Sequence, residues 1–128
     1  MSIIDNIQSI KKAIPSHVTL VAVSKTKSNN EILAAYKEGQ NIFGENKVQE
    51  LIKKREELPD DIEWHMIGHL QKNKVKYIAP FIELIHAVDS LKLMNEINKR
   101  AGQNNRIINC LLQVHIAKES SKFGFSIN

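Results

Sequence analysis

Apolar residues recur along the chain in two alternating patterns, one typical of helices and the other of strands. Isoleucines at helical spacing from Ile3 to Ile10 predict an amphipathic helix over residues 2–14, which ends before Pro15. Farther along, short apolar runs alternate with segments of helical periodicity, which predicts strands that alternate with helices. The predicted strands are residues 19–24, 41–45, 63–68 and 83–88, and the segment 106–116 is predicted to contain a fifth.

Four further helices are predicted between these strands. Ser28 and Glu31 have the spacing of a capping box at the start of the first. Asn46 can cap the second, with Gln49 reaching back to it, and Ser90 can cap the fourth. The predicted helices cover residues 28–38, 46–58, 72–79 and 91–100.

The regular spacing of these units indicates the fold class. One strand–helix unit recurs about every 22 residues, which predicts an α/β fold with a parallel sheet and right-handed crossovers. We therefore predict a single domain, residues 1–128, that forms about five β/α units of a TIM-type (β/α)8 barrel after the N-terminal helix. A doubly wound sheet is the alternative, but it needs a reversal of strand order, and no Gly-x-Gly-x-x-Gly turn follows any strand.

Residues capable of chemistry gather at one end of the predicted strands, where barrels build their sites. The strands end in Lys25, Glu45–Asn46, Gly68–His69, Asp89–Ser90 and His115. Helix capping accounts for Asn46 and Ser90 but not for the lysine or the two histidines. His65 lies within a strand, either as a core histidine or as a pocket wall, and His17 and His86 are interpreted as structural.

Lys25 has the strongest chemical signal. It follows an apolar run in which Val21 and Val23 share its face of an extended strand, so the pattern predicts an amine at the mouth of an apolar pocket. Burial and the neighbouring charge of Lys27 both disfavour the ammonium form, and a neutral amine attacks carbonyl carbons. The pattern favours a Schiff base with an aldehyde; the alternative is a strand-end lysine that extends to solvent.

Composition and charge exclude several classes of function. The formal net charge of +4 is spread along the chain, aromatic residues are few, and the basic run at residues 71–76 is interpreted as a solvated helix face, so we expect no nucleic-acid partner. No segment approaches a membrane span and the N-terminus lacks a signal-peptide pattern, which predicts a cytoplasmic protein without membrane contact. Cys110 is expected as a buried thiol, and no residue set has metal-site spacing.

Five segments, in order along the chain, resemble the pyridoxal phosphate homeostasis protein family, whose members are single-domain relatives of the alanine racemase barrel. They are residues 21–27 (VAVSKTK), 43–50 (FGENKVQE), 64–74 (WHMIGHLQKNK), 86–90 (HAVDS) and 119–124 (ESSKFG). The resemblance implies that Lys25 holds pyridoxal 5′-phosphate as a Schiff base and that Asn46 lies beside the cofactor. With His65 and His69 they make up the predicted cofactor-binding residues.

The resemblance also implies a role. Family members are similar in being cytoplasmic, in holding the cofactor at a solvent-open site, and in lacking an established reaction. The implied function is to store pyridoxal phosphate or deliver it to apo-enzymes, which keeps vitamin B6 and amino acid pools balanced. The alternatives are a pyridoxal-phosphate-dependent racemase or decarboxylase, which would need a second domain, and a Schiff-base aldolase, which would need a proton-transfer network.

The sequence departs from this family in three ways. Ser28 stands where a proline is usual, and Lys47 replaces a common tyrosine. The chain stops at Asn128, whereas family members continue for about three more strand–helix units, which carry the groups that hold the phosphate. We therefore expect a truncated barrel without a dedicated phosphate cradle, whose open sheet edges and uncovered apolar interior favour self-association.

Overall fold

The computed structural model describes residues 2–116 and 125–126. The helices are α1 (Ile3–Ala13), α2 (Asn29–Lys37), α3 (Val48–Glu57), α4 (Val75–Ile78) and α5 (Leu91–Gln103), with a 3₁₀ turn, η1 (Lys72–Lys74), before α4. The strands are β1 (Ala22–Val23), β2 (Ile42–Glu45), β3 (Glu63–Met66), β4 (Leu84–Val88), β5 (Asn109–Leu112), β6 (Val114–His115) and β7 (Phe125–Ser126). None of the helices in these residues is long and apolar enough to cross a membrane.

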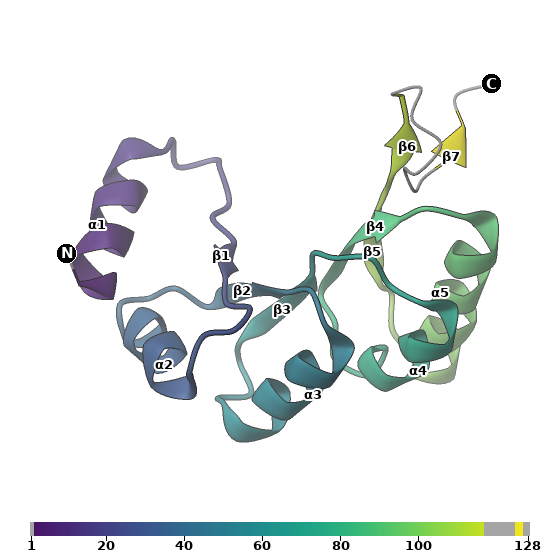
Figure 1. Ribbon diagram of the computed structural model, residues 1–128, viewed down its shortest axis with the longest axis horizontal. Helices are drawn as coiled ribbons and strands as arrows, with labels where there is room; N and C mark the ends of the chain where they lie inside the picture. Colours follow the sequence, from purple (N-terminus) through teal and green to yellow (C-terminus); the bar gives the residue numbers. More distant parts are fainter. Residues whose placement is uncertain (1, 117–124, 127–128) are drawn as a thin grey trace.

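The main sheet has five parallel strands whose spatial order, β1-β2-β3-β4-β5, is also their order along the chain. Figure 1 shows α2, α3, α4 and α5 together on one side of this sheet. A doubly wound sheet would reverse its strand order and carry helices on both faces, so it does not fit the described strands. The predicted fold class, the N-terminal portion of a β/α barrel preceded by a helix, is confirmed.

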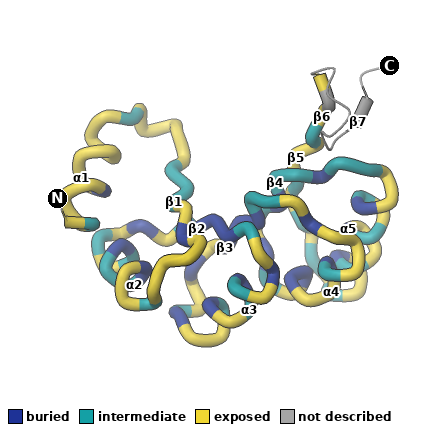
Figure 2. Tube along the Cα trace, viewed as in Figure 1, coloured by how far each residue is buried: buried dark blue, intermediate teal, exposed yellow. Residues whose placement is uncertain are grey.

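The hydrophobic core lies between the sheet and these helices. Figure 2 shows the buried residues concentrated along β2 and β3 and on the inner sides of the helices. Phe43 on β2 and Trp64 on β3 lie side by side, with their ring centroids 6.0 Å apart, and both are at most 2% exposed. Cys110 on β5 packs against this core and is half-buried. The core thus covers the face of the sheet that packs against the helices, and the opposite face takes no part in it.

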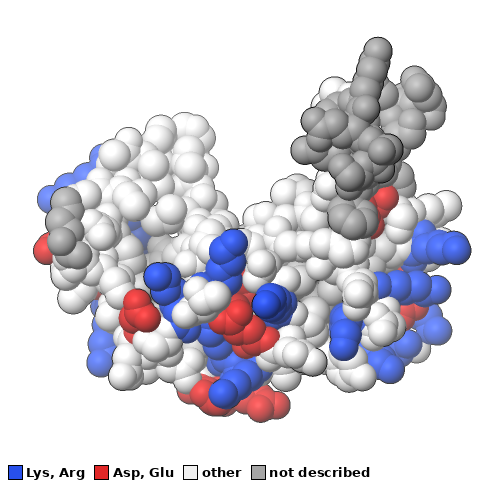
Figure 3. Space-filling model, in the orientation of Figure 1, with Lys and Arg blue, Asp and Glu red and all other residues white. Residues whose placement is uncertain are grey.

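The opposite face of the sheet is open in the described residues. Register places Val23, Gly44 and His65 next to one another on neighbouring strands, on the face turned away from Phe43 and Trp64. Val23 is 53% exposed, although it is apolar and sits in the sheet. Figure 3 shows the molecule hollowed on this side next to α1, while acidic and basic side chains intermingle over the helices.

The first and last parts of the predicted main sheet differ most from the expectation. β1 covers two residues of the predicted 19–24. Before it, the side-chain amide of Gln40 donates to the Leu20 carbonyl (2.8 Å), in place of a backbone amide of β2. The segment 106–116, which was expected to contain the fifth strand, holds both β5 and β6, and β6 pairs with β7 outside the main sheet. Arg106 lies before β5, where its guanidinium donates to the Ala79 and Ile82 carbonyls.

Two of the three predicted helix caps are confirmed. Ser28 and Glu31 form the capping box of α2, and the Ser90 hydroxyl accepts a hydrogen bond from the Leu93 amide at the start of α5. The predicted Asn46 cap is wrong, because α3 begins at Val48 and the residue at its N-cap, Lys47, makes no side-chain cap bond. The Asn46 carboxamide is therefore not used to start the helix.

Candidate functional site

The carboxyl ends of the parallel strands meet at one edge of the sheet. Asn46 directly follows β2 and His69 lies three residues after β3, so their neighbouring strands deliver both to this edge. A cavity of about 250 Å³ is lined there by Asn46 and His69, together with Met66 and Gln71. The structure thus brings two of the four predicted cofactor residues to one cavity.

Lys25 follows β1, which pairs with β2, and lies in a turn rather than on the strand. Its side chain is exposed. The apolar pocket expected beside it exists, as a cavity of about 240 Å³ between α1, β1 and α2, but among the described residues Val23 and Lys27 line it and Lys25 does not. The chain turns after Ser24, so Lys25 and Lys27 do not lie on an extended strand, which was the geometry on which the pocket prediction for Lys25 rested.

His65 is a buried member of a histidine pair. It is 6% exposed, and its Nδ1 lies 3.0 Å from Nε2 of His86 on the neighbouring strand β4. Burial lowers the pKa of both imidazoles, and the charge of His86 lowers the pKa of His65 further. This is the arrangement of a core histidine with one hydrogen-bond partner, on the open face of the sheet.

Because the pKa values of both imidazoles lie below the usual 6.5, the pair stabilises the fold most fully above that pH, and this stability is lost as the pH falls through the lowered pKa values. We expect thermal unfolding to show a steeper loss of Tm between pH 7.5 and 5 for the parent than for a His65→Leu, His86→Leu double variant. The exposed His17 supplies the control, since His17→Leu should keep the parental pH dependence. Equal slopes in the parent and the double variant would contradict the prediction.

His69 is oriented by an acidic neighbour from the next strand. Its Nδ1 lies 3.1 Å from Oδ2 of Asp89, the residue that follows β4. The imidazole is 44% exposed and the Asp89 side chain 11%, so a partly buried carboxylate holds a ring that reaches solvent. The side chain of the other predicted histidine, His115, and the segment 119–124 lie outside the described residues.

Gly68 lies two residues after β3 and allows the chain there to pass close to Asn46. A Cβ at Gly68 would lie 2.7 Å from the Asn46 Cβ and 3.0 Å from its carbonyl oxygen, closer than packed atoms approach. We expect Gly68→Ala to lower the free energy of unfolding by about 1–3 kcal/mol, as overpacking does, and to displace Asn46. Urea unfolding checks this against Gly102→Ala in α5, where nothing lies within 4 Å and the substitution should be neutral or stabilising. Equal stability of the two variants would contradict the close approach.

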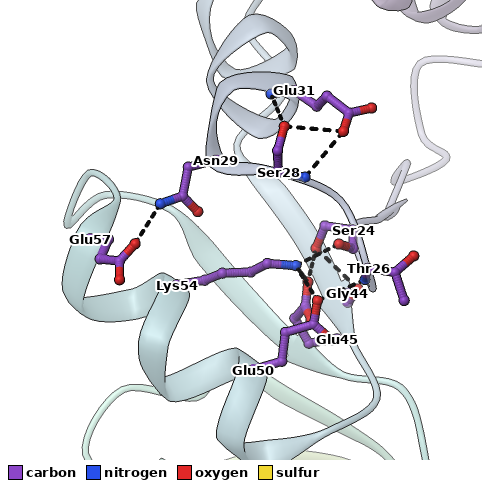
Figure 4. Close-up of polar contacts among 10 residues, drawn as sticks. All are labelled: Ser24, Thr26, Ser28, Asn29, Glu31, Gly44, Glu45, Glu50, Lys54 and Glu57. Atoms are coloured by element: carbon purple, nitrogen blue, oxygen red, sulfur yellow. Dashed lines mark hydrogen bonds and ion pairs between the residues drawn. The ribbon is translucent and has the colours of Figure 1, made fainter.

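A buried ion cluster lies beside the turn that contains Ser24 and Thr26, as Figure 4 shows. We call it the Lys54 cluster; it consists of Ser24, Glu45, Glu50 and Lys54. Burial raises the pKa of the Glu45 carboxyl and outweighs the opposing hydrogen bonds from Lys54 and Ser24. The hydrogen bond from Lys54 lowers the pKa of Glu50. The Lys54 cluster is thus a set of charged side chains enclosed next to the carboxyl ends of β1 and β2.

The sequence analysis did not identify this cluster. Its signal was present in α3, where Lys54 follows Val48 and Leu51 at three-residue spacing and so falls on the apolar face of the helix. Glu50 and Lys54 also have the i,i+4 spacing of an ion pair. A charge on the buried face of a helix needs a buried partner, and Glu45 at the end of β2 supplies it.

Comparisons with known proteins point to one family. The model of the family described as "Alanine racemase, N-terminal domain" matches residues 1–127. The pyridoxal phosphate homeostasis protein of Aquifex aeolicus (strain VF5) is 45% identical over 106 residues, which are 82% of this chain and 46% of that protein. The chain spans about half the length of the curated relatives it matches.

Solved structures agree with this family in fold. The structure of PipY from Synechococcus elongatus PCC7942 with PLP bound superposes with a TM-score of 0.89 at 37% identity, over 97% of this chain and 58% of PipY. Alanine racemase from E. faecalis gives a TM-score of 0.71 at 18% identity, over 96% of this chain and 34% of that one, a likeness of fold alone. Both neighbours are longer than this chain.

Proposed function

This chain belongs to the alanine racemase N-terminal domain family, and from that membership we propose that it binds pyridoxal phosphate and serves the homeostasis of that cofactor rather than catalysis. The observation that carries the proposal is the placement of Lys25 and Asn46 after two paired strands, at the edge where the Asn46–His69 cavity opens. Support comes from the Aquifex relative, which is named for pyridoxal phosphate homeostasis, and from PipY, whose structure holds PLP.

The residues at this edge fit the aldehyde end of such a cofactor. Lys25 is exposed, so its amine can be reached from solvent. Asn46 makes no cap bond to α3, which leaves its carboxamide for a ligand. Pockets for cofactors combine apolar walls with a few placed polar groups, and the cavity pairs Met66 with Asn46 and the oriented ring of His69.

Each residue has a separate part in the proposed binding. When bound, pyridoxal phosphate supplies an aldehyde, which a neutral primary amine converts to a Schiff base with release of water. We propose Lys25 Nζ as that amine. The Asn46 carboxamide binds and orients the ring, and Asp89 holds His69 at the cavity wall.

The test is a titration with pyridoxal phosphate followed by trapping. Adding the cofactor should produce a visible absorption band, and borohydride reduction followed by peptide mapping should place one reduced adduct on Lys25. Fragmentation of the peptide must separate Lys25 from Lys27, which lies two residues away. An adduct on another lysine would overturn the assignment of Lys25, and no adduct at all would overturn the proposed function.

The proposed role is delivery of the cofactor within the cytoplasm to apo-enzymes that use it, which would connect vitamin B6 with amino acid pools. Incubating the loaded protein with an apo-enzyme should restore that enzyme's activity. Incubation with a single-enantiomer amino acid should leave the enantiomer unchanged. Sustained racemisation would favour a racemase-like enzyme instead.

We further propose that residues 1–128 act as a single domain whose open sheet face is covered by a second copy. Val23 and Leu111, which follows the core-packed Cys110, are more than half exposed on this face. Size-exclusion chromatography should show particles larger than the 14.6 kDa of one chain, and a Val23→Ser, Leu111→Ser double variant should shift the equilibrium toward one chain. A strictly monomeric parent would contradict the proposal.

A further inference from the structure

The Lys54 cluster forms hydrogen bonds with the backbones of Ser24 and Thr26, the residues on either side of Lys25. We infer that Lys54 is a positioning residue, which sets the turn that carries Lys25 and ties it to the end of β2. This inference rests on the proposed function, because it concerns the amine assigned to the cofactor. Lys54 itself is 5% exposed and lies on α3, on the helix-covered side of the sheet, so it acts through its neighbours.

The Lys54 ammonium is fully occupied by the turn and its supports. Its Nζ lies 2.6 Å from the Ser24 carbonyl oxygen, 2.8 Å from Glu45 Oε2 and 2.8 Å from Glu50 Oε2. An ammonium group has three N–H donors, and these acceptors match them. Figure 4 shows the long Lys54 side chain extending from α3 to the point where these groups converge. The position of the Lys54 ammonium is therefore set by its bonds to Ser24, Glu45 and Glu50.

The residue after Lys25 is held by the same cluster. The Thr26 amide donates to Glu50 Oε2 at 2.7 Å, and Thr26 has a φ of 64°, in the left-handed region. A β-branched residue rarely adopts this conformation, so the turn needs support from outside its own sequence. Glu50 provides that support, and Lys54 holds Glu50 in place. Lys25 thus lies between two residues whose backbones are both bonded into the cluster.

The cluster also joins the two strands that present the proposed cofactor residues. The Ser24 hydroxyl donates to Glu45 Oε2, and the Ser24 amide donates to the Gly44 carbonyl at 3.0 Å. Glu45 immediately precedes Asn46. The end of β1 before Lys25 and the end of β2 before Asn46 are therefore fixed to one another, so the cluster can set where these side chains lie relative to each other.

The contacts of the Lys54 cluster fit a role in positioning the turn better than a role in stability alone. Glu45 is fully buried, yet its Oε1 makes no hydrogen bond with any described residue, and unsatisfied buried oxygens are costly. Buried ion pairs are often replaceable by apolar residues without loss of stability, so stability is a weak reason to hold one here. Its contacts instead converge on the segment from Ser24 to Thr26, where geometry affects the proposed chemistry.

The experiment compares Lys54→Met with Lys53→Met, which removes the same charge from the adjacent, exposed position of α3. A Glu45→Gln, Lys54→Met double variant avoids leaving Glu45 as an unpaired buried charge and keeps the test independent of gross unfolding, which circular dichroism monitors. We expect the Lys54→Met variants to bind pyridoxal phosphate at Lys25 about ten- to hundredfold more weakly, as small misplacements of reacting groups do. Lys53→Met should match the parent, and Lys54→Arg should recover part of the binding.

Amide hydrogen exchange gives a readout that needs no cofactor. The Thr26 amide should be protected in the parent and in Lys53→Met, and should exchange at least about tenfold faster in the Lys54→Met variants. Parental exchange at Thr26 in folded Lys54→Met protein would overturn the inference, and so would parental binding with altered exchange. Altered exchange in a protein whose parent forms no adduct would instead overturn the proposed function and leave the positioning of the turn supported.

Discussion

Lys25→Ala should abolish the visible Schiff-base band that the parent forms with pyridoxal phosphate. The substitution removes the amine assigned to the aldehyde in the proposed site, so borohydride should leave no reduced adduct above background. Lys25 is exposed, and surface substitutions change stability by less than about 0.5 kcal/mol, so the variant should unfold at the parental temperature. Absorbance, trapping and Tm measured on one sample separate lost chemistry from lost fold.

Lys27→Ala is the matched control for this experiment. Lys27 is also a lysine of the segment after β1, but it lines the apolar cavity beside α1 and α2. Its removal should leave the absorption band and the adduct on Lys25. A band that survives in Lys25→Ala but disappears in Lys27→Ala would assign the amine to Lys27 and would move the site from the Asn46–His69 cavity to the cavity beside α1.

Trp64→Ala should cause the largest loss of stability, about 3–5 kcal/mol in the free energy of unfolding. Trp64 is fully buried at the centre of the sheet, where its ring packs beside Phe43 and helps to close the core beneath the helices. The substitution leaves a large cavity that the neighbouring strands cannot fill. Urea unfolding measures the change, and Tyr77→Ala, an aromatic truncation at a position 49% exposed, should cost far less.

Trp64→Phe tests the polar part of the same side chain. The indole Nε1 of Trp64 is buried and has no hydrogen-bond partner among the described residues. Phenylalanine removes that unsatisfied donor while it keeps most of the ring, so this variant should lose much less stability than Trp64→Ala. Comparable losses in the two variants would mean that the Nε1 group is hydrogen-bonded in solution.

The sequence predicted the fold well because the fold depends on patterns that repeat. Alternating strand and helix periodicity fixes a parallel sheet, and local signals such as the capping box of Ser28 and Glu31 mark helix starts without reference to the rest of the molecule. The predictions that failed depend on tertiary contacts. Gln40 occupies the Leu20 carbonyl and so shortens β1, and α3 starts two residues after Asn46.

The candidate site was predictable only in part, for the same reason. Strand ends identify which residues reach the edge, and Asn46 and His69 do line one cavity there. The sequence does not reveal that the chain turns at Thr26, because a positive φ at threonine has no local signature. The spacing of Lys54 from Val48 and Leu51 places it on the apolar face of α3, but the sequence does not show that its ammonium binds the Ser24 carbonyl of this turn.

The agreement between strand order along the chain and strand order in the sheet has a consequence for how the protein acquires its structure. Each strand of the main sheet pairs with the one that precedes it, so every pairing joins segments that lie one strand–helix unit apart along the chain. Each parallel pairing closes a loop through the intervening segment, and such pairing is slow because loop entropy is lost before the contacts between the strands form. A newly synthesised unit can dock on its predecessor as it leaves the ribosome, but until it does so the unpaired strand edge is exposed and prone to aggregation.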